Sequence, residues 1–417
     1  MNLLQRLRQV VSDERDIEAV IWSAAGTAHR RLSQERVQYM CGERYTTVYA
    51  TVKFRRGCIW TLEPGPGLQS VEAQDALLQQ AAEETALKHG YMTGTRILVC
   101  DVDLRGTILC DGLYRVDPLH DSVRPGPPLD WSESMNGEGL AARRFGPPFP
   151  LSLQVRTPAS PNSVIQIRRH FEALEVVQNL LALLVHGRIR PFHEGSDRVW
   201  SVLNVGDGVR ANHLIQPGFS SPTIPSYDSP VARHAPVVGA DGYFSKRYDN
   251  LTEVSIPTTF DTDFSCAWNL SGEAGRCFRR SIHWFSLGLR NRPHPSLSLL
   301  SFATAIECLL PDVKRERCSS CNAQMGPGPT RLFKQHIFQY GEVPPDLPDL
   351  RARIYGARSA LIHGSFAASI DNIVPTYGGD AEEEIALVEH VTRTSLINWL
   401  RNQASTDPVI SASSSAA

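Results

Sequence analysis

Long apolar runs are missing from this sequence. The most apolar stretch, LLALLV at 180–185, is far shorter than the roughly 20 residues that a helix needs to cross a membrane. The opening residues, MNLLQRLRQVVSDERD, are amphipathic and soon charged, which differs from the pattern of a signal peptide. We therefore expect a cytoplasmic protein without a membrane partner.

A strong charge of one sign is also missing. The 417 residues include 42 Lys and Arg and 44 Asp and Glu, which gives a formal net charge of −2. No overall basic field is present to attract nucleic acid, so any affinity for RNA must come from a local patch. The apolar content of 42% is ordinary for a globular chain, and the length suits two or three domains.

Regular cysteine spacing is the third absence. The nine cysteines are odd in number, and several lie inside apolar runs, such as Cys100 in RILVCDVD. This distribution predicts reduced thiols in a cytosolic protein rather than a disulfide framework.

The first part of the chain mixes strand and helix patterns. Alternating apolar residues predict a hairpin and further strands, and helical spacing predicts three helices. The expected strand regions are 45–62, 96–103, 107–116, 150–158 and 198–206. The expected helices are 1–35, 70–89 and 164–186. We predict an α+β region over residues 1–260.

The last third of the chain has only helical patterns. Candidate helices lie at 273–291, 296–311, 329–340, 347–363 and 382–404, after a boundary near 255–272. We expect an all-α domain over 270–405, followed by a disordered tail of small and polar residues over 406–417.

The helix over 347–363 carries the chemistry of greatest interest. Its apolar stripe is formed by Leu350, Ile354, Ala357 and Leu361. Arg358 lies on the flank of this stripe and His363 points away from it, with Gly364 as the expected helix stop. Histidine exchanges protons near neutral pH, and arginine offers a fixed, always charged fork for phosphate oxygens. Neither side chain is needed to pack the helix.

Tyr355 and Ile362 lie on a side of this helix away from the Leu350–Leu361 stripe. We expect them to leave apolar surface that a symmetric partner could cover.

The segment YGARSALIHG resembles the R-x4–6-H signature of HEPN domains, and its residues are most similar to those of the ApeA-like group. The similarity covers roughly residues 270–405 and includes a preceding FATAIECLLP helix. It implies an all-α HEPN bundle that cleaves RNA by attack of the 2′-hydroxyl without a metal cofactor. It also implies a homodimer that serves as a bacterial toxin or antiphage effector, in abortive infection for example, with a trigger or phage component as partner. The resemblance further implies a sensing or regulatory role for the region over residues 1–260, which would sense the trigger or restrain the nuclease.

The resemblance assigns a role to individual residues. It implies that His363 is the acid or base, that Arg358 is the phosphate clamp, and that Glu307 orients one of them. Arg351, Arg353 and Ser359 are the expected RNA contacts. Ser359 departs from the Asn, Asp or His that often follows the arginine in active members. Basic residues are frequent in this part of the chain: Arg276, Arg279, Arg280, Arg290, Arg292, Lys314, Arg315, Arg317, Arg331, Lys334, Arg351 and Arg353.

Cys318 and Cys321 form half of a zinc knuckle. A closed tetrahedral site needs two further ligands, and no second C-x2-C follows. The conceivable partners are Cys277, Cys308, His283, His294 and His336. A structural zinc ion and a loop with two free thiols both remain open.

Two other functions also remain open. A catalytically inactive HEPN module would act as a dimerisation or nucleotide-binding scaffold, and Ser359 favours this alternative. In the third interpretation the ligand site lies in the N-terminal region, and the helical domain only relays the signal.

Overall fold

The structure is a computed structural model of the 417-residue chain. It describes residues 1–11, 15–26, 28–55, 58–86, 90–100, 102–110, 112–119, 149–186, 189–191, 199–206, 208–215, 224–244, 253–292, 294–311, 327–345, 347–363 and 380–406. Contacts divide the chain into two compact units: residues 1–95 with 154–175, and residues 96–153 with 176–417.

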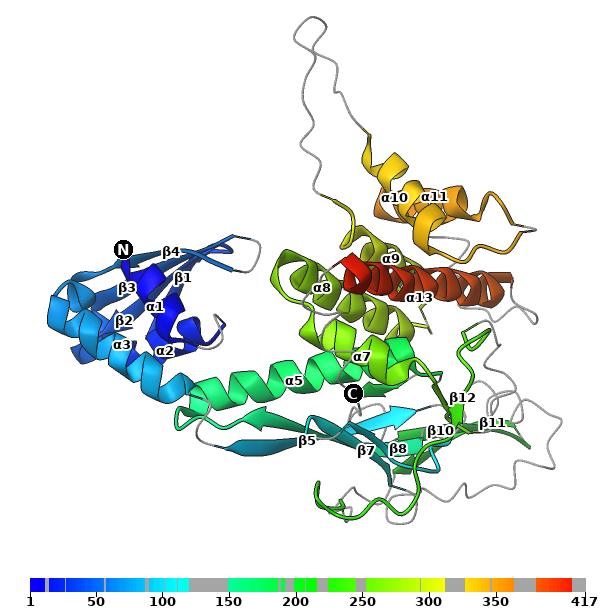
Figure 1. Ribbon diagram of the computed structural model, residues 1–417. Coiled ribbons are helices and arrows are strands. Elements are labelled where there is room, and N and C mark those ends of the chain that lie inside the picture. Colours follow the sequence, from blue (N-terminus) through cyan, green and yellow to red (C-terminus); the bar gives the residue numbers. More distant parts are fainter. Residues whose placement is uncertain are drawn as a thin grey trace, which may run out of the picture. The chain divides into compact units, whose positions relative to one another are not determined.

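The fold is α+β, with a β-rich N-terminal part and helices in the C-terminal part (Figure 1). This coarse class was predicted from the sequence. The contact division differs from the predicted boundary near 255–272, which falls within the second unit. None of the described helices combines the length and apolarity that crossing a membrane requires.

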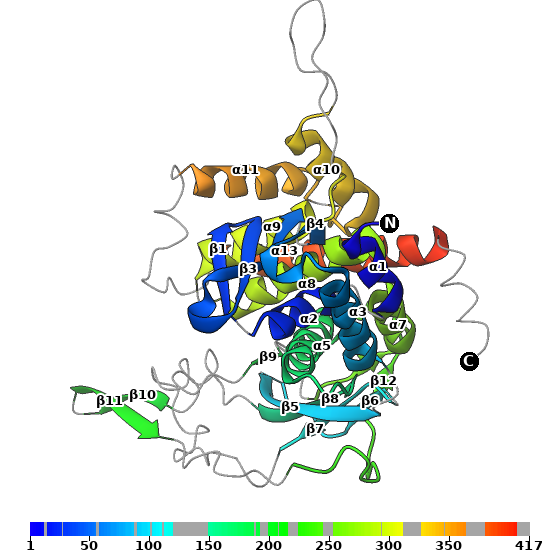
Figure 2. The same ribbon diagram turned by 90° about the vertical axis from the view of Figure 1, so that its left-hand side faces the viewer.

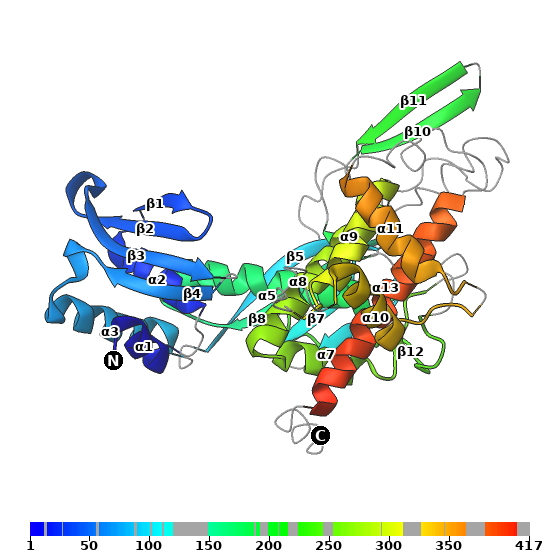
Figure 3. The ribbon, with the colours of Figure 1, turned by 90° about the horizontal axis from the view of Figure 1, so that it is seen from above.

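The first unit contains an antiparallel sheet in the order β1-β2-β3-β4. Its strands are β1 (Ala28–Ser33), β2 (Arg36–Cys41), β3 (Thr47–Arg55) and β4 (Cys58–Pro64), and its helices are α1 (Leu3–Val10), α2 (Asp16–Ala25) and α3 (Val71–Thr85). Short 3-10 turns span Glu43–Tyr45 and Pro66–Leu68. The helices cover one face of the sheet (Figure 3). The apolar side of the helices and the covered face of the sheet meet in one core, which includes Leu7, Ile17, Ile21, Ala50 and Val52.

A buried ion cluster joins α2 to a later helix of the same unit. The Asp16 side chain is fully buried and accepts hydrogen bonds from Arg168 and Arg169. Arg169 also donates to the carbonyls of Pro158 and Thr85. A buried carboxylate is tolerated only when such partners replace water, so this cluster fixes the position of α2.

A second sheet has the order β6-β7-β8-β5-β9. Its strands are β5 (Tyr91–Cys100), β6 (Ile108–Cys110), β7 (Tyr114–Pro118), β8 (Phe149–Pro158) and β9 (Arg190–Pro191). The predicted strand over 107–116 is two antiparallel strands, because Gly112 has a φ of 74° and turns the chain between them. Other paired strands are β10 (Val199–Gly206) with β11 (Gly208–Ile215), and β12 (Val237–Val238) with β13 (Ile256–Pro257).

Helix α5 (Ser163–Leu184) matches the prediction for 164–186 closely. The Asn162 side chain accepts hydrogen bonds from the backbone N–H groups of Val164 and Ile165, as expected of a cap. Its residues from Val176 onward belong to the second unit and are almost all buried.

Helices dominate the rest of the second unit. They are α7 (Phe260–Asn269), α8 (Gly272–Arg290), α9 (Pro295–Glu307), α10 (Pro329–Tyr340), α11 (Leu350–Ile362) and α13 (Asp380–Thr406). Figure 2 shows that α8, α9 and α13 form a layer above α5, with α10 and α11 outermost. Helix α13 is central, since it packs against α7, α8, α9 and α10.

Small residues bring α8 and α9 into close contact. A Cβ atom at Gly288 would lie 2.6 Å from the ring of Phe302. Ser298 donates a hydrogen bond to the Gly288 carbonyl, and Ser281 donates one to the Ala305 carbonyl. The helix that carries Glu307 is therefore held rigidly against the core.

The order of elements departs from the sequence-based expectation in several places, and strands β2 and β11, for example, were not predicted. Residues 28–33 were predicted to be helical, which is wrong, because they form the edge strand β1. Helix α7 was not predicted, and it lies where a domain boundary was expected. Asp263 on α7 binds Arg401 of α13 with distances of 2.8 and 2.7 Å. The predicted tail lies almost wholly outside the described residues.

Candidate functional site

The motif helix α11 lies on the outer side of the helical layers. Leu350 and Ile354 are buried, while the other two residues of the predicted stripe, Ala357 and Leu361, are half-buried. The helix contacts α9 and α10. Its apolar side is therefore anchored in its first half, and its second half is more accessible.

Arg358 is bound by the last residue of α9. Its Nη2 donates a hydrogen bond to Glu307 Oε2 at 2.8 Å, and both side chains are 24% exposed. The sequence-based expectation that Glu307 orients Arg358 or His363 therefore corresponds to a contact with Arg358. The guanidinium also lies 6.0 Å from the ring centroid of Tyr355.

This pairing leaves much of the Arg358 guanidinium available. Arginine has five N–H donors, and one of them makes the bond to Glu307. Its Nε is buried, but the side chain as a whole is 24% exposed, so a ligand can reach part of the guanidinium. A guanidinium that is held in place by a carboxylate through one N–H group can bind a phosphate oxygen through its remaining N–H groups.

His363 caps the C-terminus of α11. Its backbone N–H donates to the Ser359 carbonyl at 3.1 Å, and its side chain is exposed. Because it lies five residues after Arg358, the two side chains leave the helix axis roughly 140° apart. One copy of α11 thus presents the two groups on different sides. The predicted stop residue Gly364 lies outside the described residues.

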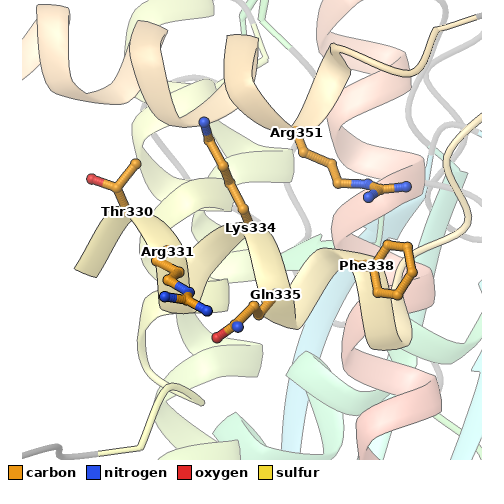
Figure 4. Close-up of a pocket in the computed structure, with 6 residues that line it drawn as sticks. All are labelled: Thr330, Arg331, Lys334, Gln335, Phe338 and Arg351. Carbon is orange, nitrogen blue, oxygen red and sulfur yellow. The ribbon is translucent and has the colours of Figure 1, made fainter. Parts of the chain in front are cut away.

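The expected RNA contacts have different surroundings. Arg351 lines a shallow groove of about 510 Å³ between α10 and α11, together with Thr330, Arg331, Lys334, Gln335 and Phe338 (Figure 4). Its guanidinium carbon lies 4.8 Å from the ring centroid of Phe338. Arg353 is exposed, and Ser359 is half-buried, with its carbonyl bound to His363.

Cys318 and Cys321, the two cysteines of the predicted zinc knuckle, lie outside the described part of the chain, whereas all five conceivable partners lie within it. Of their conceivable partners, Cys308 is a half-buried free thiol beside Glu307, and burial raises its pKa to about 11. Within the described residues, no group of three or more His, Cys, Asp or Glu side chains could hold a metal ion.

Sequence reasoning missed the aromatic part of this surface. Phe338 is 72% exposed, and Tyr355 contacts Phe333 of α10 with ring centroids 5.3 Å apart. Tyr355 was expected to be uncovered apolar surface for a symmetric partner, yet it packs within the subunit. Ile362, the other residue so assigned, is 50% exposed. The helical spacing of Arg331, Lys334 and Phe338 was the signal that could have revealed the groove.

Comparison of the chain with protein-family models, with curated proteins and with solved structures gives no match.

Proposed function

We propose that this protein is a metal-independent endoribonuclease of the HEPN type, with its catalytic centre at the C-terminal half of α11. The observation that carries the proposal is the Arg358 guanidinium, which is anchored by Glu307 on a rigid neighbouring helix and retains donors for a phosphate. The resemblance of YGARSALIHG to the HEPN motif supports the same assignment and extends it to an all-α HEPN bundle.

In this reaction the 2′-oxygen of a ribose attacks the adjacent phosphorus, and the bond to the 5′-oxygen breaks. A base removes the proton of the 2′-hydroxyl, and an acid gives a proton to the departing 5′-oxygen. His363 has the chemistry for either proton transfer, and Arg358 neutralises the charge that develops on the phosphate oxygens. The products are a 2′,3′-cyclic phosphate and a 5′-hydroxyl, with no redox change.

A single copy of the motif supplies one proton-transfer group. Arg358 and His363 also leave α11 on different sides, so a second copy of the helix is the natural source of the missing group. We therefore infer a homodimer in which both copies of Arg358 and His363 line a shared cleft. Exposed Ile362 beside His363 offers apolar surface to the partner.

In the cell, such an activity fits a toxin or antiphage effector. The N-terminal region would sense a trigger or restrain the nuclease. A structural zinc ion at Cys318 and Cys321 is compatible with this role, since zinc would take no part in the reaction.

The test compares wild type with Arg358→Ala and His363→Ala in an RNA digest that contains EDTA. We expect wild-type cleavage with cyclic-phosphate ends and loss of cleavage in both variants. Arg30→Ala, which removes an exposed arginine of β1, is the matched control and should cleave normally. Cleavage retained by both motif variants would disprove the assignment.

Assembly is tested by dilution. Specific activity and mass, followed by mass photometry, are measured through the monomer–dimer range. The activity should fall with the dimer fraction. A fully active monomer would rule out the shared cleft while leaving the ribonuclease assignment intact.

The ion pair between Arg358 and Glu307 also favours a second candidate function, that of a non-enzymatic HEPN scaffold. In that case Arg358 only ties α11 to α9, and Ser359 marks a lost site. Wild type would then cleave no RNA, and Arg358→Ala would lower the melting temperature without any other effect.

A further inference from the structure

Helix α10 has two stripes of opposite character. Phe333, His336 and Ile337 are buried against the other helices. Arg331, Lys334, Gln335 and Phe338 recur at i, i+3, i+4 and i+7 and are all exposed. The outer stripe therefore presents two cations and an aromatic ring on one side of a well-packed helix.

Arg351 completes this surface from α11. It lies over the ring of Phe338 at 4.8 Å, and its Nε has no hydrogen-bond partner among the described residues. Phe338 remains 72% exposed although the guanidinium covers one side of its ring. The ring thus keeps a free face, and Figure 4 shows the Arg351 side chain extending from α11 so that its guanidinium lies over Phe338.

The groove leads toward the proposed catalytic arginine. Seven residues make almost two full turns of helix, so Arg351 and Arg358 leave α11 on nearly the same side, about 10 Å apart along its axis. Tyr355 lies between them on this side. Cations and aromatic rings therefore alternate along the path from Phe338 to Arg358.

We propose that the groove between α10 and α11 is a binding subsite for single-stranded RNA, in which a base stacks on Phe338 and phosphates bind Arg331, Lys334 and Arg351. This inference rests on the proposed ribonuclease function, because it places the substrate strand beside Arg358. A ring can accept a base only when that base is not paired within a duplex, and the combination of cations with an exposed ring is typical of single-strand binding.

Charge favours a nucleic acid over a protein as occupant. The six residues that line the groove include three cations and no carboxylate. The whole chain has a net charge of −2, so this concentration of positive charge is local. A phosphate backbone complements it along its length.

The experiment measures binding of a fluorescein-labelled 2′-O-methyl oligouridine to the full-length protein by fluorescence anisotropy. This probe lacks the attacking 2′-hydroxyl, so wild type can be used without cleavage. Phe338→Ala should weaken binding roughly five- to hundredfold, as loss of a stacked base does. Phe338→Trp should preserve or strengthen binding. The same strand in a duplex should bind more weakly than when single.

Trp60→Ala is the matched control. Trp60 on β4 is 60% exposed and also lies under an arginine, Arg55, at 4.9 Å. Its removal should leave affinity unchanged. Lys334→Ala should lower the slope of log K against log salt by about 0.7, which is the contribution of one phosphate contact to a single strand.

Unchanged affinity in Phe338→Ala would overturn the proposal, as would equal binding of the duplex. A change in sedimentation of Phe338→Ala without a change in RNA affinity would also overturn it, by showing a contact between protein copies. Phe338-dependent binding in a protein that cleaves no RNA would support the subsite and disprove the nuclease. Metal-free cleavage together with RNA binding that does not depend on Phe338 would support the nuclease and disprove the subsite.

Discussion

Arg393 and Arg358 have similar neighbours in two different settings. Each lies on a helix of the second unit, is paired with a glutamate and faces an aromatic ring. The Arg393 side chain is only 2% exposed, as is that of its partner Glu389. Arg358 and Glu307 are each 24% exposed. Burial, rather than the type of residue, separates a structural ion pair from one that a ligand can reach.

The buried pair is also more completely satisfied. Arg393 donates to the carbonyls of Ala182 and Leu183 at the end of α5, and Arg292 approaches Glu389 within 3.1 Å. These contacts close the C-terminus of α5 and tie it to α13. Arg358 makes one hydrogen bond within the described part of the chain and keeps donors for a phosphate.

The largest effect should follow from breaking the buried pair. Arg393→Met removes one of the two arginines at the buried Glu389 and leaves the carbonyls at the end of α5 without this donor. We expect a loss of about 3–5 kcal/mol in the free energy of unfolding, measured by urea denaturation. Arg6→Met is the control, since the Arg6–Asp75 pair is exposed and worth about 0–1 kcal/mol. Equal losses in the two variants would contradict the distinction by burial.

The inner face of α10 offers a comparison with its cationic outer face. Burial lowers the pKa of His336 to about 4, and its Nε2 has no hydrogen-bond partner among the described residues. The unfolded chain binds a proton at this histidine below about pH 6.5, whereas the folded protein does so only near pH 4. The free energy of unfolding is therefore unaffected by this histidine above about pH 6.5, and it falls as the pH drops from about 6.5 to about 4.

The cost should reach about 3 kcal/mol at pH 4. Urea denaturation of wild type and His336→Leu from pH 7 to pH 4 provides the measurement. The variant should lose less stability than wild type over this window. Parallel pH profiles would show that His336 does not titrate as its burial predicts.

Two glycines compare the core layer with the outer layer. Gly288→Ala on α8 would push a methyl group against Phe302, and overpacking of this kind costs about 1–3 kcal/mol. Gly356→Ala on α11 meets no atom within 4 Å, so the better helix propensity of alanine should stabilise by about 0.5–1 kcal/mol. Thermal melting should therefore shift in opposite directions. A shift in the same direction would show that α11 is as tightly packed as α8.

Strong periodicity explains what the sequence could predict. The patterns of α5, α8 and α10 repeat over several turns, and their bounds were predicted within a few residues. Residues 28–33 carry no comparable signal: all but one are exposed, and they form a strand because β2 pairs with them. Helix α7 is short and depends on the distant Arg401. Such partners are not visible in a local window.

The candidate site divides in the same way. A contact between Glu307 and the motif was expected from the resemblance of the motif to HEPN domains, and it is made with Arg358. The stacking of Arg351 on Phe338 depends on how α10 and α11 pack, which spacing within one helix does not encode. The same packing sets Tyr355 against Phe333 and leaves it half-buried, so less of its ring is available to a partner subunit than expected.

The smallest effect on stability should come from the exposed pair. A double-mutant cycle with Arg358→Met, Glu307→Gln and the combined variant isolates the interaction between the two side chains. At 24% exposure we expect a coupling of about 0.2–1 kcal/mol, against a larger coupling for the Arg393–Glu389 cycle. RNA cleavage by the same variants separates the structural role of Arg358 from its role as a phosphate clamp. Glu307→Gln should reduce cleavage only partly, because Arg358 is still present but less well oriented. Arg358→Met should abolish cleavage. A coupling as large as that of the buried pair would mean that Arg358 is committed to holding α11 on α9, and its role as a phosphate clamp would have to be abandoned.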